Sequence, residues 1–206
     1  MNMRRVVISL FVCLFLFTCF TNQASAYKRF YYCGKLNGGV YARTWGISPN
    51  SYTLHNRTVN YYDRALYAVS SWNGINPTTT SKEDVSLSHT SNVSSATLRF
   101  YVGSYGNYDW DGCIEHYDSS GKYIYVYATP GNWDYCKMFI NAYHTNQSVY
   151  TNSIINAIAG HEIGHAFGLD DLRDSRDQNT LMWYQSGGYR TEGITSDEVN
   201  GIRDIY

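Results

Sequence analysis

One stretch of eleven residues near the C-terminus constrains the fold more than any other part of the chain. It runs from His161 to Asp171 and reads H-E-x-x-H-x-x-G-x-x-D. Residues four apart lie on the same face of an α-helix, so His161 and His165 can present two imidazole nitrogens to one cation. Gly168 lets the chain leave the helix through a left-handed conformation, and the returning chain can bring Asp171 to the cation. Three protein ligands and one open position are typical of catalytic zinc sites.

Glu162 lies on the next radial position of the same helix. There its carboxylate can reach a metal-bound water without ligating the metal, as a general base must. Asp170 is either a hydrogen-bond partner of the site or a competing ligand, and the spacing favours Asp171. The alternative for the whole stretch is a surface helix with two histidines and a chance glutamate.

The stretch from His161 to Tyr206 resembles the catalytic core of metzincin zinc endopeptidases, closest to the matrixin branch. Residues 191–206 read TEGITSDEVNGIRDIY and are similar to the final matrixin helix, D-V-x-G-I-x-x-L-Y. Matrixins place histidine where this chain has Asp171, and the aspartate resembles the third ligand of snapalysin-type metzincins. The resemblance implies a catalytic Zn²⁺ held by His161, His165 and Asp171, with Glu162 as general base.

The same resemblance implies roles for two residues further along the chain. Met182 corresponds to the Met-turn residue, a hydrophobic floor beneath the metal and not a ligand. Tyr184 corresponds to the tyrosine that ligates zinc and stabilises the oxyanion in astacin- and serralysin-type metzincins. Packing beside the turn is the alternative for Tyr184.

A calcium ion or a second zinc ion is conceivable near His116, as in many matrixins. The nearby aspartates lack the spacing of a known calcium loop, so no clear motif supports such a site. We expect these residues and the other scattered histidines to be solvated loop residues. The residues concerned are Asp109, Asp111, His116, Asp118, His89 and His144.

Residues 1–26 have the features of a secretory signal peptide. Arg4 and Arg5 precede an apolar run, and Ala24 to Ala26 form an A-x-A cleavage site. An uncleaved membrane anchor is the alternative. Removing this segment leaves 14 basic against 17 acidic residues, which argues neither for nucleic acid nor for an anionic membrane surface. We expect a secreted, extracellular monomer.

The rest of the chain predicts one domain of the α+β class. The predicted fold is that of the metzincins (zincins): a twisted mixed sheet of about five strands, two long helices, a Met-turn and a short C-terminal helical subdomain. Residues 27–39 form an N-terminal segment, for which one interpretation is a short pro-segment. Residues 40–206 form the catalytic domain. Strands are predicted at 40–45, 85–89, 96–102, 123–128 and 137–143; helices are predicted at 60–72, from 154 through the histidines, and after a capping box of Thr195 and Glu198.

Three cysteines remain after the predicted signal peptide is removed. Pairing Cys113 with Cys136 is the simplest disulfide in an oxidising compartment. Cys33 is then a free or intermolecular thiol. By resemblance to matrixin zymogens, it could instead occupy the open zinc position.

We therefore expect a secreted zinc-dependent metalloendopeptidase. An extended peptide or protein substrate would bind along a sheet edge at 123–128. One alternative is a non-catalytic secreted zinc-binding protein of the same fold, and another is a protease dedicated to one partner protein. Glu162 favours catalysis, because a non-catalytic protein has no need of a carboxylate there.

Overall fold

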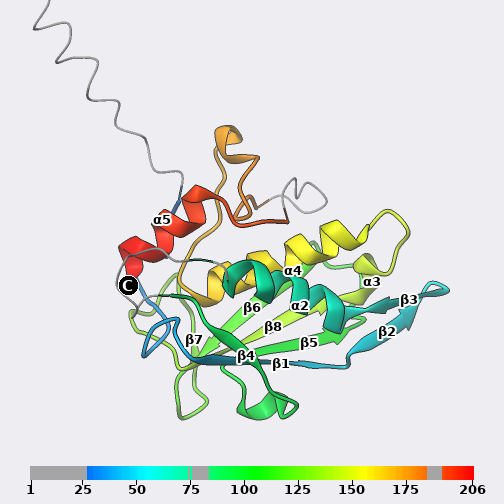
Figure 1. Cartoon of the computed structure of the whole chain (residues 1–206), viewed down its shortest axis with the longest axis horizontal. Coiled ribbons are helices and arrows are strands. Elements are labelled where there is room, and N and C mark those ends of the chain that lie inside the picture. Colours follow the sequence, from blue (N-terminus) through cyan, green and yellow to red (C-terminus); the bar gives the residue numbers. More distant parts are fainter. Residues whose placement is uncertain (1–26, 74, 76–83, 185–191) are drawn as a thin grey trace, which may run out of the picture.

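The computed structural model describes residues 27–73, 75, 84–184 and 192–206, so the predicted signal peptide at 1–26 lies outside the described residues. In the described part, a six-stranded sheet forms one layer and two long helices cover one of its faces (Figure 1). None of the helices in these ranges is both long enough and apolar enough to cross a lipid bilayer. The architecture is a mixed α/β fold.

The central sheet is mixed in strand direction. Its spatial order is β4-β1-β5-β8-β6-β7, in which β4, β1, β5 and β8 run parallel and β6 runs antiparallel to β8 and to β7. A separate antiparallel hairpin consists of β2 and β3. The strands are β1 (Arg43–Ser48), β2 (Ser51–Leu54), β3 (Arg57–Asn60), β4 (Leu87–His89), β5 (Leu98–Gly103), β6 (Gly112–Tyr117), β7 (Tyr123–Ile124) and β8 (Tyr135–Asn141).

Alternation along the central strands decides which face the helices cover. In β5, Leu98, Phe100 and Val102 are buried, whereas the residues between them are only partly buried. The same alternation in β8 buries Met138 and Ile140. One fully apolar face with period two is the pattern of a sheet that packs on helices through that face.

Two long helices, α2 (Tyr61–Asn73) and α4 (Asn152–Ala166), lie side by side over this face (Figure 1). The apolar stripe of α2 buries Ala65, Val69 and Trp72, as the three- and four-residue spacing predicts. The predicted helix at 60–72 is therefore confirmed within one residue at each end.

Helix α4 is buried along most of its length, from its second turn to its end. The side chain of Thr151 caps its first turn by accepting a hydrogen bond from a backbone N–H. Two buried tryptophans donate hydrogen bonds to backbone carbonyls of α4. Nε1 of Trp72 donates to the carbonyl of Gly160 (3.0 Å), and Nε1 of Trp133 donates to the carbonyl of Ala166 (2.9 Å). These hydrogen bonds fix the position of the helix that carries both histidines.

The chain after α4 returns to the body through α5 (Ser196–Ile205). The predicted capping box of Thr195 and Glu198 is present. Glu198 also accepts a hydrogen bond from the backbone N–H of Met182 (3.1 Å), which joins α5 to the loop after α4. The remaining short elements are α3 (Ala142–Thr145), η1 (Val93–Ser95) and η2 (Ser175–Asp177).

The prediction of a sheet of about five strands is wrong, because the sheet has six strands. The missed strand is β6, whose sequence Gly-Cys-Ile-Glu-His-Tyr lacks a clear period-two alternation. The predicted strand at 123–128 pairs only over Tyr123–Ile124, because a turn follows in which Ala128 N donates to Tyr125 O (3.0 Å). The hairpin of β2 and β3 was also absent from the prediction.

The predicted disulfide between Cys113 and Cys136 is wrong, because both cysteines are free. The pairing of β6 with β8 places Cys113 opposite Phe139 and Cys136 opposite His116. The two cysteines are thus three residues out of register and on opposite faces of the sheet, where no disulfide can join them. Cys33 is exposed and free, and it does not line the pocket that contains His161 and His165.

Candidate metal centre

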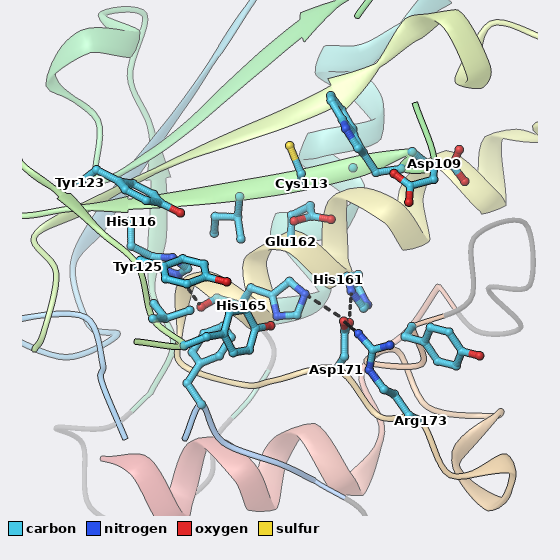
Figure 2. A pocket seen from close by; sticks show the side chains of 18 residues that line it. Asp109, Cys113, His116, Tyr123, Tyr125, His161, Glu162, His165, Asp171 and Arg173 are labelled. Atoms are coloured by element: carbon cyan, nitrogen blue, oxygen red, sulfur yellow. Dashed lines mark hydrogen bonds and ion pairs between the residues drawn. The ribbon is translucent and has the colours of Figure 1, made fainter. Parts of the chain in front are cut away.

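The structure brings His161, His165 and Asp171 together at the end of α4 (Figure 2). Oδ1 of Asp171 lies 3.3 Å from Nε2 of His161 and 3.5 Å from Nε2 of His165. Zinc bonds of ~2.0–2.2 Å in a tetrahedron place neighbouring ligand atoms ~3.4 Å apart. Within the described residues, this is the only group of three or more such side chains whose ligand atoms all lie within 4.8 Å of one another. The donor set and its spacing fit a zinc ion.

Backbone carbonyls fix the orientation of both imidazoles. Nδ1 of His161 lies 2.9 Å from the carbonyl of Leu181, and Nδ1 of His165 lies 2.8 Å from the carbonyl of Leu169. A carbonyl oxygen only accepts, so each Nδ1 carries the proton and each Nε2 offers a lone pair. Two nitrogen lone pairs and a carboxylate oxygen therefore converge on one point. Such convergence repels unless a cation or a proton lies between the atoms.

The charges of the three ligands are coupled. Burial opposes ionisation of Asp171, but the contacts with His161 and His165 outweigh it and lower the pKa of its carboxyl well below the usual range. Burial alone would lower the pKa of His165, but contact with Asp171 raises it overall. Asp171 is thus a carboxylate at any ordinary pH, as a metal ligand must be.

The turn after α4 follows the predicted path. The helix ends at Ala166, and Gly168 adopts a φ of 103°, which residues with a Cβ rarely adopt. This turn carries Asp171 back towards the histidines.

The two adjacent aspartates point in different directions. Asp170 is buried, its Oδ2 lies 2.5 Å from Nζ of Lys28, and its Oδ1 accepts a hydrogen bond from the hydroxyl of Tyr127 (3.0 Å). Oδ1 also accepts from the backbone N–H of Asp171 (2.9 Å). Asp170 therefore holds the loop in place, and Asp171 faces the histidines.

Glu162 faces the same pocket from α4 and is almost fully buried. A Cβ added to Gly112 on β6 would lie 2.6 Å from its Oε1, so only glycine leaves room for this carboxyl. Burial raises the pKa of Glu162 to about 7; His161 opposes this shift and Asp171 adds to it. Its Oε2 has no hydrogen-bond partner among the described residues. Glu162 can therefore give a proton to, or take one from, a group in the pocket near neutral pH.

Met182 lies beneath α4 and is buried. A Cβ added to Gly164 would lie 2.3 Å from its sulfur, so the side chain fills the space that this glycine leaves on the helix. The preceding residue, Leu181, accepts the hydrogen bond from His161. Met182 therefore packs against α4 at Gly164, next to the residue whose carbonyl orients His161, and its role as a floor beneath a metal stays a prediction.

Tyr184 lies at the rim of the pocket and is partly exposed. The guanidinium of Arg173 lies over its ring, 4.9 Å from the centroid, and Nη2 of Arg173 lies 3.2 Å from Oδ2 of Asp171. Arg173 thus connects Tyr184 to the second oxygen of the carboxylate ligand. The role of Tyr184 in binding the metal stays a prediction.

His116 is not a solvated loop residue, so that prediction is wrong. It is buried on β6, and its Nε2 donates to the carbonyl of His165 (3.2 Å). Burial lowers its pKa to about 3, with the hydrogen bond to His165 opposing this shift. His116 is therefore a neutral imidazole that is hydrogen-bonded to α4, the helix that carries His161 and His165.

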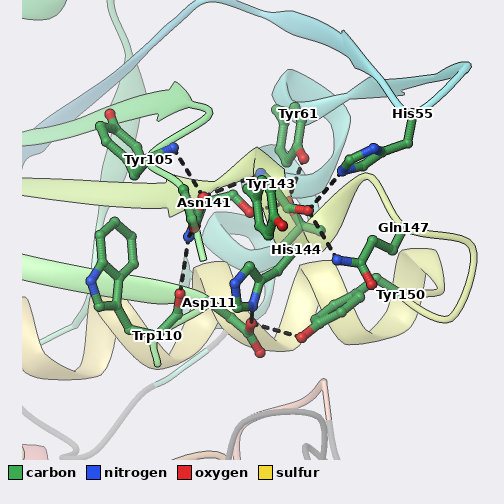
Figure 3. Close-up of polar contacts among 12 residues, drawn as sticks. His55, Tyr61, Tyr105, Trp110, Asp111, Asn141, Tyr143, His144, Gln147 and Tyr150 are labelled. Atoms are coloured by element: carbon green, nitrogen blue, oxygen red, sulfur yellow. Dashed lines mark hydrogen bonds and ion pairs between the residues drawn. The ribbon is translucent and has the colours of Figure 1, made fainter. Parts of the chain in front are cut away.

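Asp111 is also buried, contrary to the prediction, and forms a polar cluster beside the pocket (Figure 3). Its Oδ1 lies 3.0 Å from Nδ1 of His144 and accepts a hydrogen bond from the hydroxyl of Tyr150 (2.7 Å). The backbone N–H of Asn141 donates to the carbonyl of Asp111 (2.8 Å). This cluster anchors the start of β6 next to Glu162.

The three metal-ligand candidates open into a pocket of about 510 Å³. Such a volume is typical of small-ligand sites. Its aromatic wall was missed in the sequence, although the alternation Tyr-Ile-Tyr-Val-Tyr at 123–127 is a signal for it. The lining residues are Phe30, Asp109, Trp110, Asp111, Gly112, Cys113, Ile114, His116, Tyr123, Tyr125, Val126, Tyr127, His161, Glu162, His165, Asp171, Arg173 and Tyr184.

Comparisons with known proteins give a structural likeness and no sequence family. No family model matches the chain, and no curated protein matches it. One of the solved structures that match is described as the GM1 bound form of the ECX AB5 holotoxin. The match covers 86% of this chain and 91% of that chain, with a TM-score of 0.53 and 15% sequence identity. At this identity the likeness shows the fold alone.

These findings contradict the assignment to the metzincin family and to its fold. The fold is a mixed α/β arrangement similar to that of a chain in an AB5 toxin structure, and no family model supports a matrixin-like catalytic domain. The prediction of a zinc endopeptidase is contradicted for the same reason, because the matched structure is described as a toxin with bound GM1 and not as a peptidase. A short motif and a C-terminal helix pattern were too local to decide the family.

Proposed function

We propose that the chain binds one Zn²⁺ ion through His161, His165 and Asp171, and that the ion helps to bind a carbohydrate or protein partner in the pocket. The observation that carries the proposal is the convergence of two Nε2 atoms and Oδ1 at spacings of 3.3 and 3.5 Å. Both imidazoles are already oriented by backbone carbonyls, so little rearrangement is needed to bind a metal.

The bound ion would supply a positive charge that an oxygen atom of the partner can approach. Arg173 would keep Asp171 turned towards the ion through its contact with Oδ2. Glu162 would accept a hydrogen bond from a hydroxyl or amide of the partner, or donate one when protonated. The residues of the pocket thus offer polar groups of both kinds next to one cation.

The class of partner is suggested by the structural comparison and by the pocket. The matched structure is described as an AB5 holotoxin bound to GM1, which points to a protein or carbohydrate partner and not to an extended peptide substrate. The pocket is large enough for a small ligand or for one end of a larger one. We also propose that the chain is secreted, on the strength of the signal-like residues 1–26.

Metal analysis of the purified chain tests the zinc proposal directly. We expect about one zinc per chain after dialysis against metal-free buffer, and almost none in His161→Ala or His165→Ala. His89→Ala is the matched control, because His89 is exposed on β4 and is not among the pocket residues. Wild-type protein without stoichiometric zinc after zinc loading would overturn the proposal.

A further inference from the structure

Three tyrosines form one wall of the metal pocket. Tyr123, Tyr125 and Tyr127 alternate with Ile124 and Val126, which are buried in the core. The tyrosines are 48%, 50% and 48% exposed, and all three line the pocket. Figure 2 shows Tyr123 and Tyr125 on the side of the pocket away from Arg173. The sequence alternation thus presents a row of aromatic rings beside the metal ligands.

The row is held in place at both ends. The ring centroids of Tyr123 and Tyr125 lie 6.4 Å apart, and those of Tyr125 and Tyr127 lie 5.8 Å apart. Tyr127 contacts the ring of Phe30 at 5.5 Å and donates its hydroxyl hydrogen to Asp170. At the other end, Tyr123 contacts Tyr117 at 5.9 Å. The rings are therefore preorganised, which lowers the entropy cost of binding on them.

An aromatic pair stands at another part of the pocket. Trp110 lines the pocket, and its ring stacks on that of Tyr108 with centroids 6.1 Å apart and an angle of 7°. A ligand in the pocket can therefore contact aromatic surface at Trp110 as well as at Tyr125.

Carbohydrate fits this surface better than protein does. The C–H groups on one face of a sugar ring are attracted to the negative face of an aromatic ring, and its hydroxyls need polar partners at the edge. The tyrosine row offers the aromatic faces, and Asp109, Glu162 and the metal offer the polar partners. The side chains that dominate protein interfaces insert into fully desolvated pockets instead, whereas this wall remains half exposed.

The charges of the pocket favour a neutral sugar. Four carboxyl side chains line the pocket. Among the described lining residues there is no lysine, and Arg173 is the single arginine. Arg173 is already paired with Asp171. With zinc bound, the four carboxyls face three positive charges, two from the ion and one from Arg173, so the pocket has no excess of positive charge to attract an acidic sugar.

We propose that this pocket binds a neutral oligosaccharide, with sugar rings stacked on Tyr123 and Tyr125 and hydroxyls directed to the metal centre. This inference rests on the proposed function and names its partner class. The tyrosines would supply most of the contact area, and the metal would fix the position of one end of the ligand.

Calorimetric titration tests the proposal with the zinc-loaded full chain. The probes are neutral oligosaccharides (lactose, chitotriose, cellotetraose), sialyllactose as the acidic counterpart, and an unfolded polypeptide. We expect at least one neutral probe to bind, and Tyr123→Ala and Tyr125→Ala each to weaken its binding about tenfold. Tyr125→Trp should retain binding. Tyr41→Ala and Tyr67→Ala are the controls, because these tyrosines are 54% and 45% exposed but do not line the pocket.

Zinc content, measured on each variant, separates this proposal from the zinc proposal. Tyrosine-dependent binding of a neutral probe by a chain without zinc would support the sugar site and overturn the zinc centre. A chain with one zinc that binds no neutral probe at millimolar concentration overturns the sugar site alone. Binding of only sialyllactose or only the polypeptide, or equal loss in the Tyr67→Ala control, also overturns it.

Discussion

At the scale of single residues, two adjacent aspartates have separate tasks. Asp171 faces the two imidazoles, whereas Asp170 is turned towards Lys28 and Tyr127. We expect Asp171→Ala to weaken zinc binding more than about 100-fold, because it removes a ligand, and Asp170→Ala to weaken it about tenfold through loss of positioning. Competition against a chromogenic chelator measures both affinities. The reverse ranking would show that the loop presents the other carboxylate.

A buried histidine should make the fold sensitive to acid. The folded-state pKa of His116 is about 3, below its usual value of 6.5. Above pH 6.5 the imidazole is neutral in both the folded and the unfolded chain, so the free energy of unfolding is at its full value there. This stability is lost progressively as the pH falls from 6.5 towards 3. At pH 4.5 the expected loss is about 3 kcal/mol, from two pH units below the usual pKa.

The measurement is urea unfolding of metal-free protein at pH 7.5 and at pH 4.5. His116→Gln should be less stable at pH 7.5 but should lose less stability between the two values than the wild type does. His89→Ala, whose histidine is exposed, should keep the wild-type difference. An unchanged pH dependence in His116→Gln would contradict the assignment of a buried neutral imidazole.

At the scale of elements, α5 and the loop after α4 share one carboxylate. Glu198 completes the capping box with Thr195 and also accepts the backbone N–H of Met182. Thr195→Ala should cost about 1 kcal/mol of stability, as the loss of an N-cap usually does. Glu198→Ala should cost about 1–3 kcal/mol more, because it leaves the buried N–H of Met182 without a partner.

Chemical denaturation of the two variants gives both values, and Asp197→Ala is a control in the same helical turn. Only Glu198→Ala should also weaken zinc binding. Glu198 holds the backbone of Met182, and the carbonyl of the preceding residue, Leu181, orients His161. Equal stability losses in Thr195→Ala and Glu198→Ala would show that the hydrogen bond to Met182 contributes nothing.

At the scale of the whole molecule, the metal should link the separate parts of the chain. The ligands come from α4 and the loop after it, and this loop contacts Lys28, near the start of the described residues, and the helix α5. At free zinc of about 100 times Kd, binding adds about 2.7 kcal/mol to the free energy of unfolding. We expect a chelator to lower the Tm by about 5–10 °C, since each kcal/mol shifts Tm by about 2–4 °C for a domain of this size.

Differential scanning calorimetry with and without chelator measures this shift. His161→Ala should already melt at the lower temperature and should not respond to the chelator. A wild-type Tm that is the same with zinc, with chelator and with neither would mean that the ion is bound weakly or not at all.

Local patterns in the sequence predicted local structure well. The helix at 60–72, the turn at Gly168 and the capping box of α5 depend on residues a few positions apart, and all are present. The convergence of His161, His165 and Asp171 also lies within one short stretch. These features follow from helix geometry and turn chemistry, so neighbouring residues are sufficient to predict them.

Long-range features could not be predicted in the same way. The strand β6 depends on pairing with β8, and the burial of His116 and Asp111 depends on how that strand meets α4. The disulfide prediction failed because register between distant strands is not encoded in cysteine spacing. The family assignment failed at the largest scale, since motif residues describe a site and not the protein that carries it.

The two tryptophans that hold α4 have a practical consequence for anyone who handles this protein. Trp72 and Trp133 both donate their indole N–H to carbonyls of the helix that bears His161 and His165. We therefore expect their emission to respond to small displacements of that helix. A fluorimeter alone, without any attached dye, should follow the arrival and departure of the ion in real time.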